Sequence, residues 1–471
     1  MTARFSSTKP FKIAVVGTGI SGMSSAWLLA KSHEVTVFEQ NDYIGGHSNT
    51  VTAYHNGDQI PVDTGFIVYN EQTYPNLTAL FNNLNVQTLT SEMSFSASLQ
   101  NGDFEYSGTN LNGLLGQRRN ILRPRFWRML RDIQRFYREA PGFLCSNSDN
   151  AYTIGAFLEH YNYSESFIND HLIPMGAAIW STTVEEMKNY PVNAFIRFFL
   201  SHGLLNITNR PVWRTVRGGS KEYVRRLTES YKHNIRFEKV LGISRKSDCV
   251  EIKTNKNEAE IFDHVVIATH ADEALLLLED PSVREKSLLS TWRYTKNHAV
   301  LHNDPSLMPK RKRIWSSWNF IANGKADQNE KVCLTYWMNR LQNITESKPL
   351  FVTLNPDEMI KGEAIISQHE YTHPYFDTAA LESQKDLWDI QGLNRTWFCG
   401  SYFGYGFHED GLQSGLAVAE QLGGLSRPWS SINMNNRIML KSFNPVAAWI
   451  LNQQFTEVLL TTKDCGPNDI F

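Results

Sequence analysis

The sequence predicts an α/β protein in which a parallel-sheet domain is interleaved with a second, α+β domain. Residues 11–39 read as strand, glycine turn, helix and strand. Residues 212–270 again alternate between strand-like and helix-like segments, and a helix rich in glycine and alanine follows residue 408. Because strands that alternate with helices are typical of doubly wound parallel sheets, we expect these segments to share one sheet.

Composition bounds the class of protein. The chain has 471 residues, 41% of them hydrophobic, which is enough for a large core and two or three domains. Lys and Arg total 46 against 48 acids, so no global field attracts nucleic acid. Five scattered cysteines without a C-x-x-C pair argue against a disulfide framework or a metal site. No signal peptide or spanning helix is evident, and we expect a cytoplasmic protein.

The first strand and its glycine turn predict dinucleotide binding. The apolar run 11–16 leads into GTGISG, in which Gly17 makes a tight turn, Gly19 lets the backbone approach a pyrophosphate, and Gly22 packs the helix against the strand. Glu39 ends the second strand, where a carboxylate can accept hydrogen bonds from both ribose hydroxyls. This Rossmann-like unit, with an acid that disfavours a 2′-phosphate, favours FAD or NAD over NADP.

Several longer motifs resemble a known superfamily. A Gly-Gly pair follows the ribose acid and a glycine-containing helix lies near the C-terminus, as in the FAD-linked amine oxidases, protoporphyrinogen oxidases and phytoene desaturases. Four stretches resemble bacterial flavoproteins of this group that accompany cyclopropane-fatty-acid-synthase-type enzymes: DTGFIVYNEQTYPNLTALF, TYWMNRLQ, FVTLNP and GYGFHEDGLQSG. The resemblance covers residues 11–430 and implies an amine-oxidase-like fold with FAD. Some relatives attach flavin through a C-terminal Cys, but Cys399 stands elsewhere in the pattern, so we expect noncovalent FAD.

The resemblance also implies cofactor contacts. His47 stands where the superfamily usually has an Arg near the pyrophosphate, and imidazole can donate a hydrogen bond there but supplies less fixed charge. Val240 is implied to lie beside the adenine, with a plain buried strand residue as the alternative. Backbone N–H groups of the turn 410–412 are implied to stabilise negative charge on reduced flavin. The predicted cofactor-binding residues are Gly17, Gly19, Ile20, Ser21, Gly22, Glu39, Gly46, His47, Gly65, Phe66, Val240, Gly400, Asp410 and Leu412.

The same pattern predicts the domain boundaries. The FAD-binding domain would comprise residues 1–70, 212–290 and 391–424, the substrate-binding domain 71–211 and 291–390, and a C-terminal extension 425–471. The substrate-binding segments are rich in aromatic residues, most of which we expect in the core and some in an apolar cavity. The candidates are Trp180, Phe195, Phe198, Phe199, Trp315, Trp318, Phe320, Tyr336 and Trp337.

Residues 118–138 carry eight arginines and one acid. On a helix that begins near Pro124, one face would hold Arg128, Arg131, Arg135 and Arg138, and the opposite face Phe126, Leu130, Ile133 and Tyr137. A basic amphipathic helix is the signature of docking on an anionic membrane, here the inner surface of the membrane; the alternative is a solvated arginine face. The apolar segment 443–460 is too short to span a bilayer, and we expect it to cover the domain surface.

The stretch before the C-terminal helix holds the predicted catalytic residues, His408, Glu409 and Tyr405. An imidazole near the flavin could carry a proton at neutral pH, while packing or capping is the alternative for His408. Acids in a first turn favour the helix dipole, which is the structural interpretation of Glu409. Tyr402 with Tyr405 could form half of the aromatic cage of an amine oxidase. His373 and Lys296 are weaker catalytic candidates.

These features together favour an FAD-dependent oxidoreductase that oxidises or dehydrogenates a fatty-acyl chain or a modified fatty acid, the lipid being implied by the resemblance. Two other enzymatic interpretations stay open, a redox-neutral lipid double-bond isomerase and an amine oxidase. A third is a flavin-binding accessory subunit of a lipid methyltransferase system. The expected partners are a lipid substrate and a cyclopropane-synthase-type methyltransferase.

Overall fold

The first sheet contains the strand that precedes the glycine turn. The computed structural model describes residues 9–55, 57–146, 152–206, 210–322, 333–430 and 434–441. All neighbouring strands of this sheet are parallel, and they come from widely separated parts of the sequence. Their spatial order is β10 (Ile235–Phe237), β2 (Glu34–Glu39), β1 (Lys12–Val16), β14 (His264–Ile267) and β20 (Thr396–Phe398). This sheet confirms the predicted α/β fold class.

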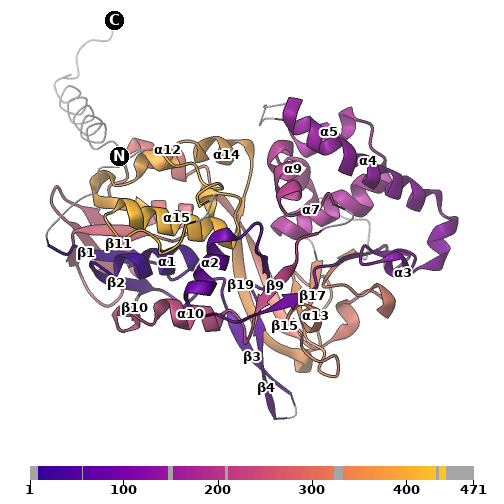
Figure 1. The fold of residues 1–471 in the computed structure, drawn as a ribbon, viewed down its shortest axis with the longest axis horizontal. Coiled ribbons are helices and arrows are strands. Elements are labelled where there is room, and N and C mark those ends of the chain that lie inside the picture. Colours follow the sequence, from indigo (N-terminus) through magenta and orange to yellow (C-terminus); the bar gives the residue numbers. More distant parts are fainter. Residues whose placement is uncertain are drawn as a thin grey trace, which may run out of the picture.

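Helix α1 (Ile20–Leu29) packs against the sheet, and α15 (His408–Gln421) packs against α1 (Figure 1). A Cβ on Gly415 would lie 2.2 Å from the carbonyl oxygen of Ser21, and one on Gly411 would lie 2.9 Å from the Cγ2 of Ile20. Gly411 and Gly415 therefore let α15 approach helix α1 closely. Every residue of α1 is buried as a result.

A second sheet of seven strands combines strands from both ends of the aromatic-rich segments. Its neighbours are antiparallel except for β16 and β7, which run parallel. The order is β19 (Ile365–Tyr375), β15 (Arg293–His302), β18 (Phe351–Leu354), β17 (Cys333–Trp337), β16 (Trp318–Ala322), β7 (Phe95–Leu99) and β8 (Phe104–Ser107). How the chain divides into domains stays a prediction.

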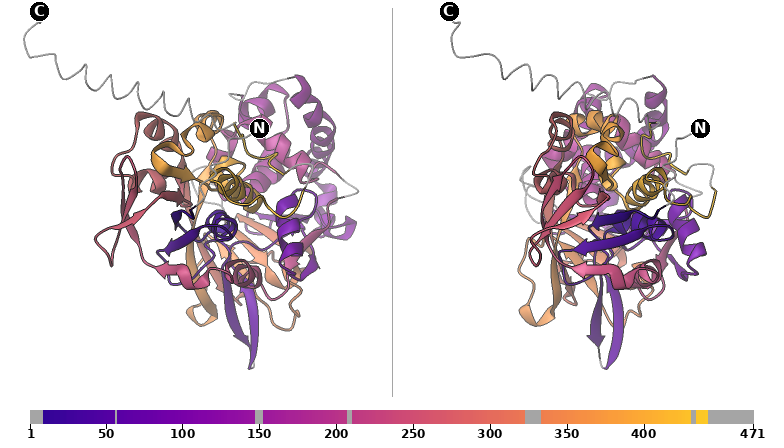
Figure 2. Two further views of the ribbon diagram at one scale, coloured as in Figure 1. Left: turned by 60° about the vertical axis from the view of Figure 1, so that its left-hand side comes forward. Right: turned by 90° about the vertical axis from the view of Figure 1, so that its left-hand side faces the viewer.

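Three smaller sheets complete the strands. One holds β11 (Val240–Arg245), β12 (Val250–Thr254) and β13 (Glu260–Phe262), and another holds β5 (Tyr69–Asn70), β9 (Trp213–Val216) and β6 (Thr88–Ser91). The hairpin of β3 (Thr50–His55) and β4 (Asp58–Asp63) projects from the body in Figure 1 and in both views of Figure 2.

The helices α4, α5, α7 and α9 form a lobe at the upper right of Figure 1, apart from β1, β2 and α1. They span Pro124–Ser146, Ile154–His160, Ile173–Trp180 and Val192–Ser201. A π-helical turn, Ile168–Leu172, leads into α7 and carries His171. The other α-helices of four or more residues in the described ranges are α2 (Pro75–Asn83), α3 (Leu111–Leu114), α8 (Val184–Lys188), α10 (Lys221–Thr228), α11 (Ala271–Leu277), α12 (Val283–Leu289), α13 (Met338–Leu341) and α14 (Thr378–Gln384).

Helix α4 has the two faces that the sequence predicts. Phe126 is fully buried, while Leu130, Ile133 and Tyr137 are partly buried and pack against the core. Arg128, Arg131 and Arg138 are exposed on the other side. The helix is therefore anchored by its apolar face and presents its arginines to solvent.

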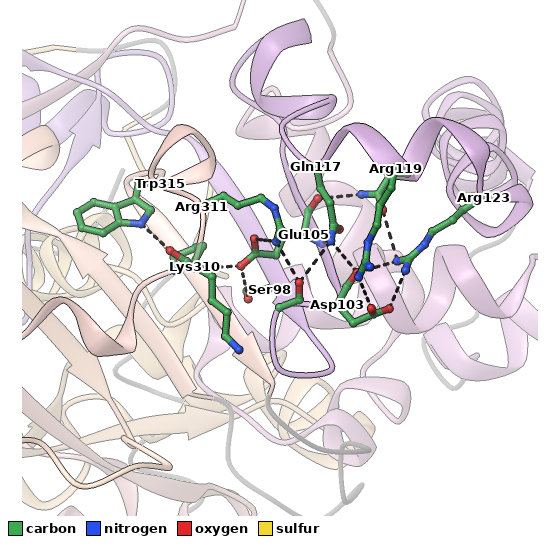
Figure 3. A network of polar contacts seen from close by, with 12 residues as sticks. Ser98, Asp103, Glu105, Gln117, Arg119, Arg123, Lys310, Arg311 and Trp315 are labelled. Atoms are coloured by element: carbon green, nitrogen blue, oxygen red, sulfur yellow. Dashed lines mark hydrogen bonds and ion pairs between the residues drawn. The ribbon is translucent and has the colours of Figure 1, made fainter.

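Arg119, Arg123 and Arg125, which precede or begin this helix, are paired with acids from other parts of the chain. Arg119 and Arg123 both bind Asp103, which lies in the turn between β7 and β8, and Arg311 binds Glu105 on β8 (Figure 3). Arg125 donates from Nε to the Asp170 carboxylate at 2.6 Å. Part of the basic charge is thus neutralised by the fold, and on α4 itself Arg131 pairs with Asp132 at 3.4 Å and Arg138 with Glu139 at 3.2 Å.

None of the described helices is long and apolar enough to cross a bilayer. The apolar segment 443–460 lies outside the described residues, so its predicted role stays a prediction. Of the described cysteines, Cys249, Cys333 and Cys399 are free thiols.

Candidate functional site

One large cavity, of about 1040 Å³, joins the glycine turn to the aromatic-rich part of the chain. We call its two parts the fingerprint half, lined by residues 16–21, 38–41, 238–241 and 268–270, and the aromatic half. The aromatic half is lined by Tyr74, Phe95, Tyr106, Tyr137, Met175, Trp180, Phe198, Trp213, Trp318, Tyr336 and Phe376, among others. The predicted site residues that line the cavity are Gly17, Gly19, Ile20, Ser21, Glu39, Gly46, His47, Gly65, Phe66, Val240, Gly400, Tyr405 and His408.

The glycine turn has the geometry that a phosphate-binding turn needs. Gly17 adopts a φ of +101°, which favours glycine. A Cβ on Gly22 would lie only 2.0 Å from the carbonyl oxygen of Gly17, so helix and turn approach too closely for a side chain. A Cβ on Gly19 would meet no protein atom within 4 Å. The backbone at Gly19 is therefore open to the cavity, beside the N-terminus of α1.

Glu39 is held in place at the end of β2, on the cavity wall. One carboxylate oxygen accepts hydrogen bonds from the backbone N–H of Thr18, at 3.0 Å, and from its hydroxyl. The other accepts from the backbone and side-chain nitrogens of Asn41, at 2.9 and 3.0 Å. The carboxylate thus has a fixed orientation beside the glycine turn, as a ribose acceptor requires.

A second glycine segment closes on the first. Gly46 has a φ of +57°, and a Cβ there would lie 3.2 Å from the Cα of Gly19. The backbone N–H of Phe66 donates to the carbonyl of His47 at 2.7 Å, and a Cβ on Gly65 would lie 2.2 Å from the same oxygen. Residues 45–47 and 65–66 therefore form one layer over the glycine turn.

Three histidines gather where that layer meets the second sheet. The ring of His47 lies 5.4 Å from His373, 6.3 Å from His270 and 5.0 Å from Tyr371. Burial, with a neighbouring imidazole as the second cause, lowers the pKa of His47 and of His270 to about 4. His47 is therefore neutral at pH 7, and it can offer a phosphate a hydrogen bond but no fixed charge.

Of the two weaker candidates, the structure brings only His373 to the cavity. His373 lies on β19, and its Nδ1 is 3.1 Å from the amide nitrogen of Asn297. Lys296 is 68% exposed and forms an ion pair with Glu370 at 3.1 Å. His270 is a cavity residue outside the predicted set, although it follows the carboxyl end of β14, a neighbour of β1, which is a usual place for site residues.

His408 is tightly packed in the cavity wall. Its ring stacks on Phe66 with centroids 3.9 Å apart, and its Nε2 lies 2.7 Å from the hydroxyl of Tyr223, which in turn contacts Ser48. Burial, with His47 as the second cause, lowers the pKa of His408 to about 3. A group with this pKa holds almost no proton at pH 7 and is a weak base, so the geometry favours packing over the proton-carrying role.

Glu409 does not reach the cavity, which argues against the catalytic role predicted for it. Its carboxylate is buried and accepts hydrogen bonds from the backbone N–H groups of Asn76 and Leu77, each at 3.0 Å, and from the side chains of Asn76 and Gln413. Asn76 and Leu77 lie in the first turn of α2. Glu409 therefore caps another helix, a role that a carboxylate at a helix N-terminus fills well.

The backbone N–H groups of the turn 410–412, predicted to face the flavin, are engaged within the first turn of α15. The backbone N–H groups of Asp410 and Gly411 donate to the carbonyl of Phe407, at 3.0 and 3.2 Å, because α15 begins one residue earlier than expected. Asp410 uses its carboxylate to accept from the N–H of Phe407, at 2.7 Å. Leu412 is fully buried and does not line the cavity, whereas Gly411 does.

Tyr405 lies on the cavity wall beside Arg197. Burial raises the pKa of its hydroxyl, which the Arg197 side chain contacts, so the group is a neutral phenol at pH 7. Tyr402 is buried and packs its ring against Trp292 and Phe403, with centroids 5.6 and 4.8 Å away. Both tyrosines line the cavity, but their surroundings differ, because Tyr402 also belongs to the hydrophobic core.

Cys399 is buried behind the glycine turn. Burial raises the pKa of its thiol to about 12, and the hydroxyls of Ser21 and Ser25 are its hydrogen-bond partners. A thiol in this state is a poor nucleophile, which fits noncovalent binding of the cofactor. No group of His, Cys, Asp or Glu within the described ranges could hold a metal ion.

The family model described as flavin containing amine oxidoreductase matches residues 20–300, more than half of the chain. No curated protein matches the sequence significantly. Solved structures share the fold. Cyclohexylamine oxidase from Brevibacterium oxydans IH-35A has a TM-score of 0.63 at 15% identity, over 88% of this chain and 100% of that one. A putrescine oxidase bound to putrescine has a TM-score of 0.62 at 15% identity, over 88% of this chain and 98% of that one. A CLA-producing fatty acid isomerase from P. acnes has a TM-score of 0.62 at 13% identity, over 88% of this chain and 98% of that one.

Proposed function

Because the chain belongs to the flavin containing amine oxidoreductase family, and so is an FAD-dependent oxidoreductase, we propose that its substrate is a long apolar molecule of the fatty-acyl class. The reaction proposed is dehydrogenation or a related oxidation of that chain. The observation that carries the proposal is the single cavity, which continues from the fingerprint half into a half lined mainly by aromatic and aliphatic side chains.

The described residues of the fingerprint half fit FAD. Gly19 leaves open space beside the N-terminus of α1, Glu39 holds a fixed carboxylate at the end of β2, and Val240 and Leu241 add apolar lining. FAD, when bound, supplies the acceptor for a hydride from carbon. The chain's own part is to bind and orient the substrate and to keep water out.

The charges of the aromatic half favour an apolar or anionic substrate over an amine. Of the four described acids that line the cavity, Glu39 and Glu238 belong to the fingerprint half, Glu273 accepts a hydrogen bond from the backbone N–H of His270 at 3.3 Å, and Glu370 pairs with Lys296 at 3.1 Å. Two histidines of this half, His171 and His202, are neutral at pH 7, because burial lowers their pKa values to about 4 and about 3. A protonated amine would therefore find no unpaired carboxylate there.

Anaerobic titration of the flavin tests this proposal. The holoenzyme is mixed with saturated, unsaturated and cyclopropane fatty acids, and with alkylamines of the same chain lengths as matched controls, while the visible absorbance of the flavin is followed. We expect at least one fatty acid to bleach the flavin and the amines to leave it oxidised. Bleaching by the amines alone would overturn the proposal.

A second candidate function is redox-neutral isomerisation of a lipid double bond, which a solved structure of the same fold favours because it is a fatty acid isomerase. The same titration separates the two. A shifted double bond in the recovered fatty acid, with no lasting bleaching, would identify an isomerase. Binding of lipids without either change would instead favour the accessory role beside a methyltransferase, and that partner stays a prediction.

We also propose that the start of the helical lobe contacts an anionic membrane surface. Leu111 is 77% exposed, Leu122 85% and Trp127 51%, and the exposed Arg128 and Arg131 lie nearby in the chain. Apolar side chains beside arginines complement the interface of an anionic bilayer. Vesicles of phosphatidylglycerol should therefore sediment the protein, vesicles of phosphatidylcholine should not, and Leu122→Ser should weaken the effect. Equal sedimentation by both vesicles would contradict the contact.

A further inference from the structure

The aromatic half ends at a cationic side chain that neither the fingerprint nor the predicted catalytic residues explain. Arg210 lines the cavity and is also exposed, so the cavity meets the surface there. Tyr137 of α4 and His171 of the π-helical turn line the same cavity. Burial is the larger influence on the pKa of each, and the charge of Arg210 acts to lower both, as a close neighbour would. Among the described lining residues of the aromatic half, Arg210 is the one Arg or Lys.

The terminal nitrogens of Arg210 have no carboxylate partner among the described residues. Its Nε donates to the carbonyl of Asn206 at 2.8 Å, which fixes the base of the guanidinium. The nearby acid Asp170 is already paired, because Arg125 donates from Nε to its carboxylate at 2.6 Å. No described carboxylate therefore neutralises the charge of Arg210, and its terminal nitrogens can donate to an anionic ligand.

The neighbouring groups can add hydrogen bonds but no charge. The hydroxyl of Tyr106 donates to the carbonyl of Asp170 at 2.8 Å and lies 3.0 Å from Nδ1 of His171, so His171 carries its proton on Nδ1. Burial lowers the pKa of His171 to about 4, and burial raises that of Tyr137, so both groups are neutral at pH 7. Tyr137 then presents a hydroxyl donor beside the guanidinium.

We infer that Arg210, with the hydroxyl of Tyr137, binds the carboxylate of a free fatty acid whose acyl chain lies in the aromatic half. This inference rests on the proposed fatty-acyl substrate and sharpens it, because it selects the free acid over an ester, an amide or an amine. An apolar channel that ends at one exposed cation suits a chain that enters with its apolar end first and stops when its carboxylate reaches the cation.

The test compares oleate with methyl oleate, below the concentration at which oleate forms micelles. Binding to the oxidised holoenzyme is followed by the change in flavin absorbance or by calorimetry. A hydrogen-bonded ion pair typically changes affinity by about 10- to 100-fold. We therefore expect wild type to bind oleate more tightly than the ester by such a factor, Arg210→Gln to remove the difference, and Arg210→Lys to restore part of it. Tyr137→Phe should give a smaller loss.

Arg217→Gln is the matched control, since Arg217 is exposed and does not line the cavity. This variant should bind both ligands as wild type does. If wild type binds oleate and its ester equally, or if Arg210→Gln keeps the preference for oleate, the carboxylate site is wrong while the fatty-acyl proposal stands. If neither ligand binds to wild type, the fatty-acyl proposal fails and the carboxylate site fails with it.

Discussion

Replacing Gly19 with alanine should separate cofactor binding from folding. Gly19 has φ −60° and ψ 173°, which alanine adopts without strain, and the new methyl group would meet no protein atom within 4 Å. The substitution should therefore leave the apoprotein as stable as wild type, or more stable by about 0.4–1 kcal/mol. The methyl group would stand where the pyrophosphate approaches, and overpacking of about 1–3 kcal/mol corresponds to FAD binding that is about 5- to 150-fold weaker.

Gly22→Ala is the matched variant, in the same turn but with the opposite expectation. Its methyl group would lie 2.0 Å from the carbonyl oxygen of Gly17 and 3.1 Å from the Cβ of Ala268. The backbone must move, so the free energy of unfolding should fall by about 1–3 kcal/mol or more. Urea unfolding of the apoproteins and fluorescence titration with FAD measure both quantities. A Gly19→Ala variant with wild-type FAD affinity would refute the reasoning.

Three further predictions concern individual side chains. His408→Phe keeps the stack on Phe66 and removes a group whose pKa is about 3, so the pH profile of kcat/KM should stay unchanged. The value of kcat/KM should fall much less than the roughly 100-fold or more that loss of a general acid or base causes. A fall of that size would show that His408 takes part in the reaction. Glu409→Gln should replace one accepting oxygen by an amide donor that faces the N–H groups in the first turn of α2. The free energy of unfolding in urea should therefore fall by about 1–3 kcal/mol, while turnover per folded molecule stays unchanged. An unchanged free energy of unfolding would count against the capping role. His302 is buried, with Nε2 2.7 Å from Thr353, and burial lowers its pKa to about 4 in the fold. The unfolded chain binds its proton near pH 6.5, so the stability that neutral His302 contributes is complete above that pH and is lost as the pH falls toward about 4. The stability advantage of wild type over His302→Asn should then shrink by up to about 1.4 kcal/mol per pH unit in that window, and a constant difference would show that the pKa is not lowered.

The sequence could predict the first part of the site because strand, turn and helix are contiguous there. The apolar run that ends at Val16 and the glycines that follow dictate where the chain turns, and α1 begins at Ile20, inside the predicted turn. The faces of α4 could be predicted for the same reason, since a period of 3.6 residues sorts arginines from apolar side chains within one helix.

Contacts between distant segments could not be predicted in this way. The partners of Glu409 on α2 are more than 330 residues away in the sequence. From its own segment alone, the Glu409 carboxylate could be interpreted only as a first-turn acid of α15 or as a catalytic group. His47, His270 and His373 meet only because β14 and β19 end beside the layer over the glycine turn. The pKa of His408 also depends on this packing, since burial comes from Phe66, Tyr223 and their neighbours rather than from its own segment.

The most direct test of the account is a crystal structure of the FAD-loaded protein with oleate. We predict the dinucleotide along Gly17–Ser21 with its ribose at Glu39, and the acyl chain in the aromatic half with its carboxylate at Arg210. An aromatic half that stays empty of lipid at saturating oleate, or that holds part of the dinucleotide instead, would contradict the assignment of this half to a fatty-acyl chain.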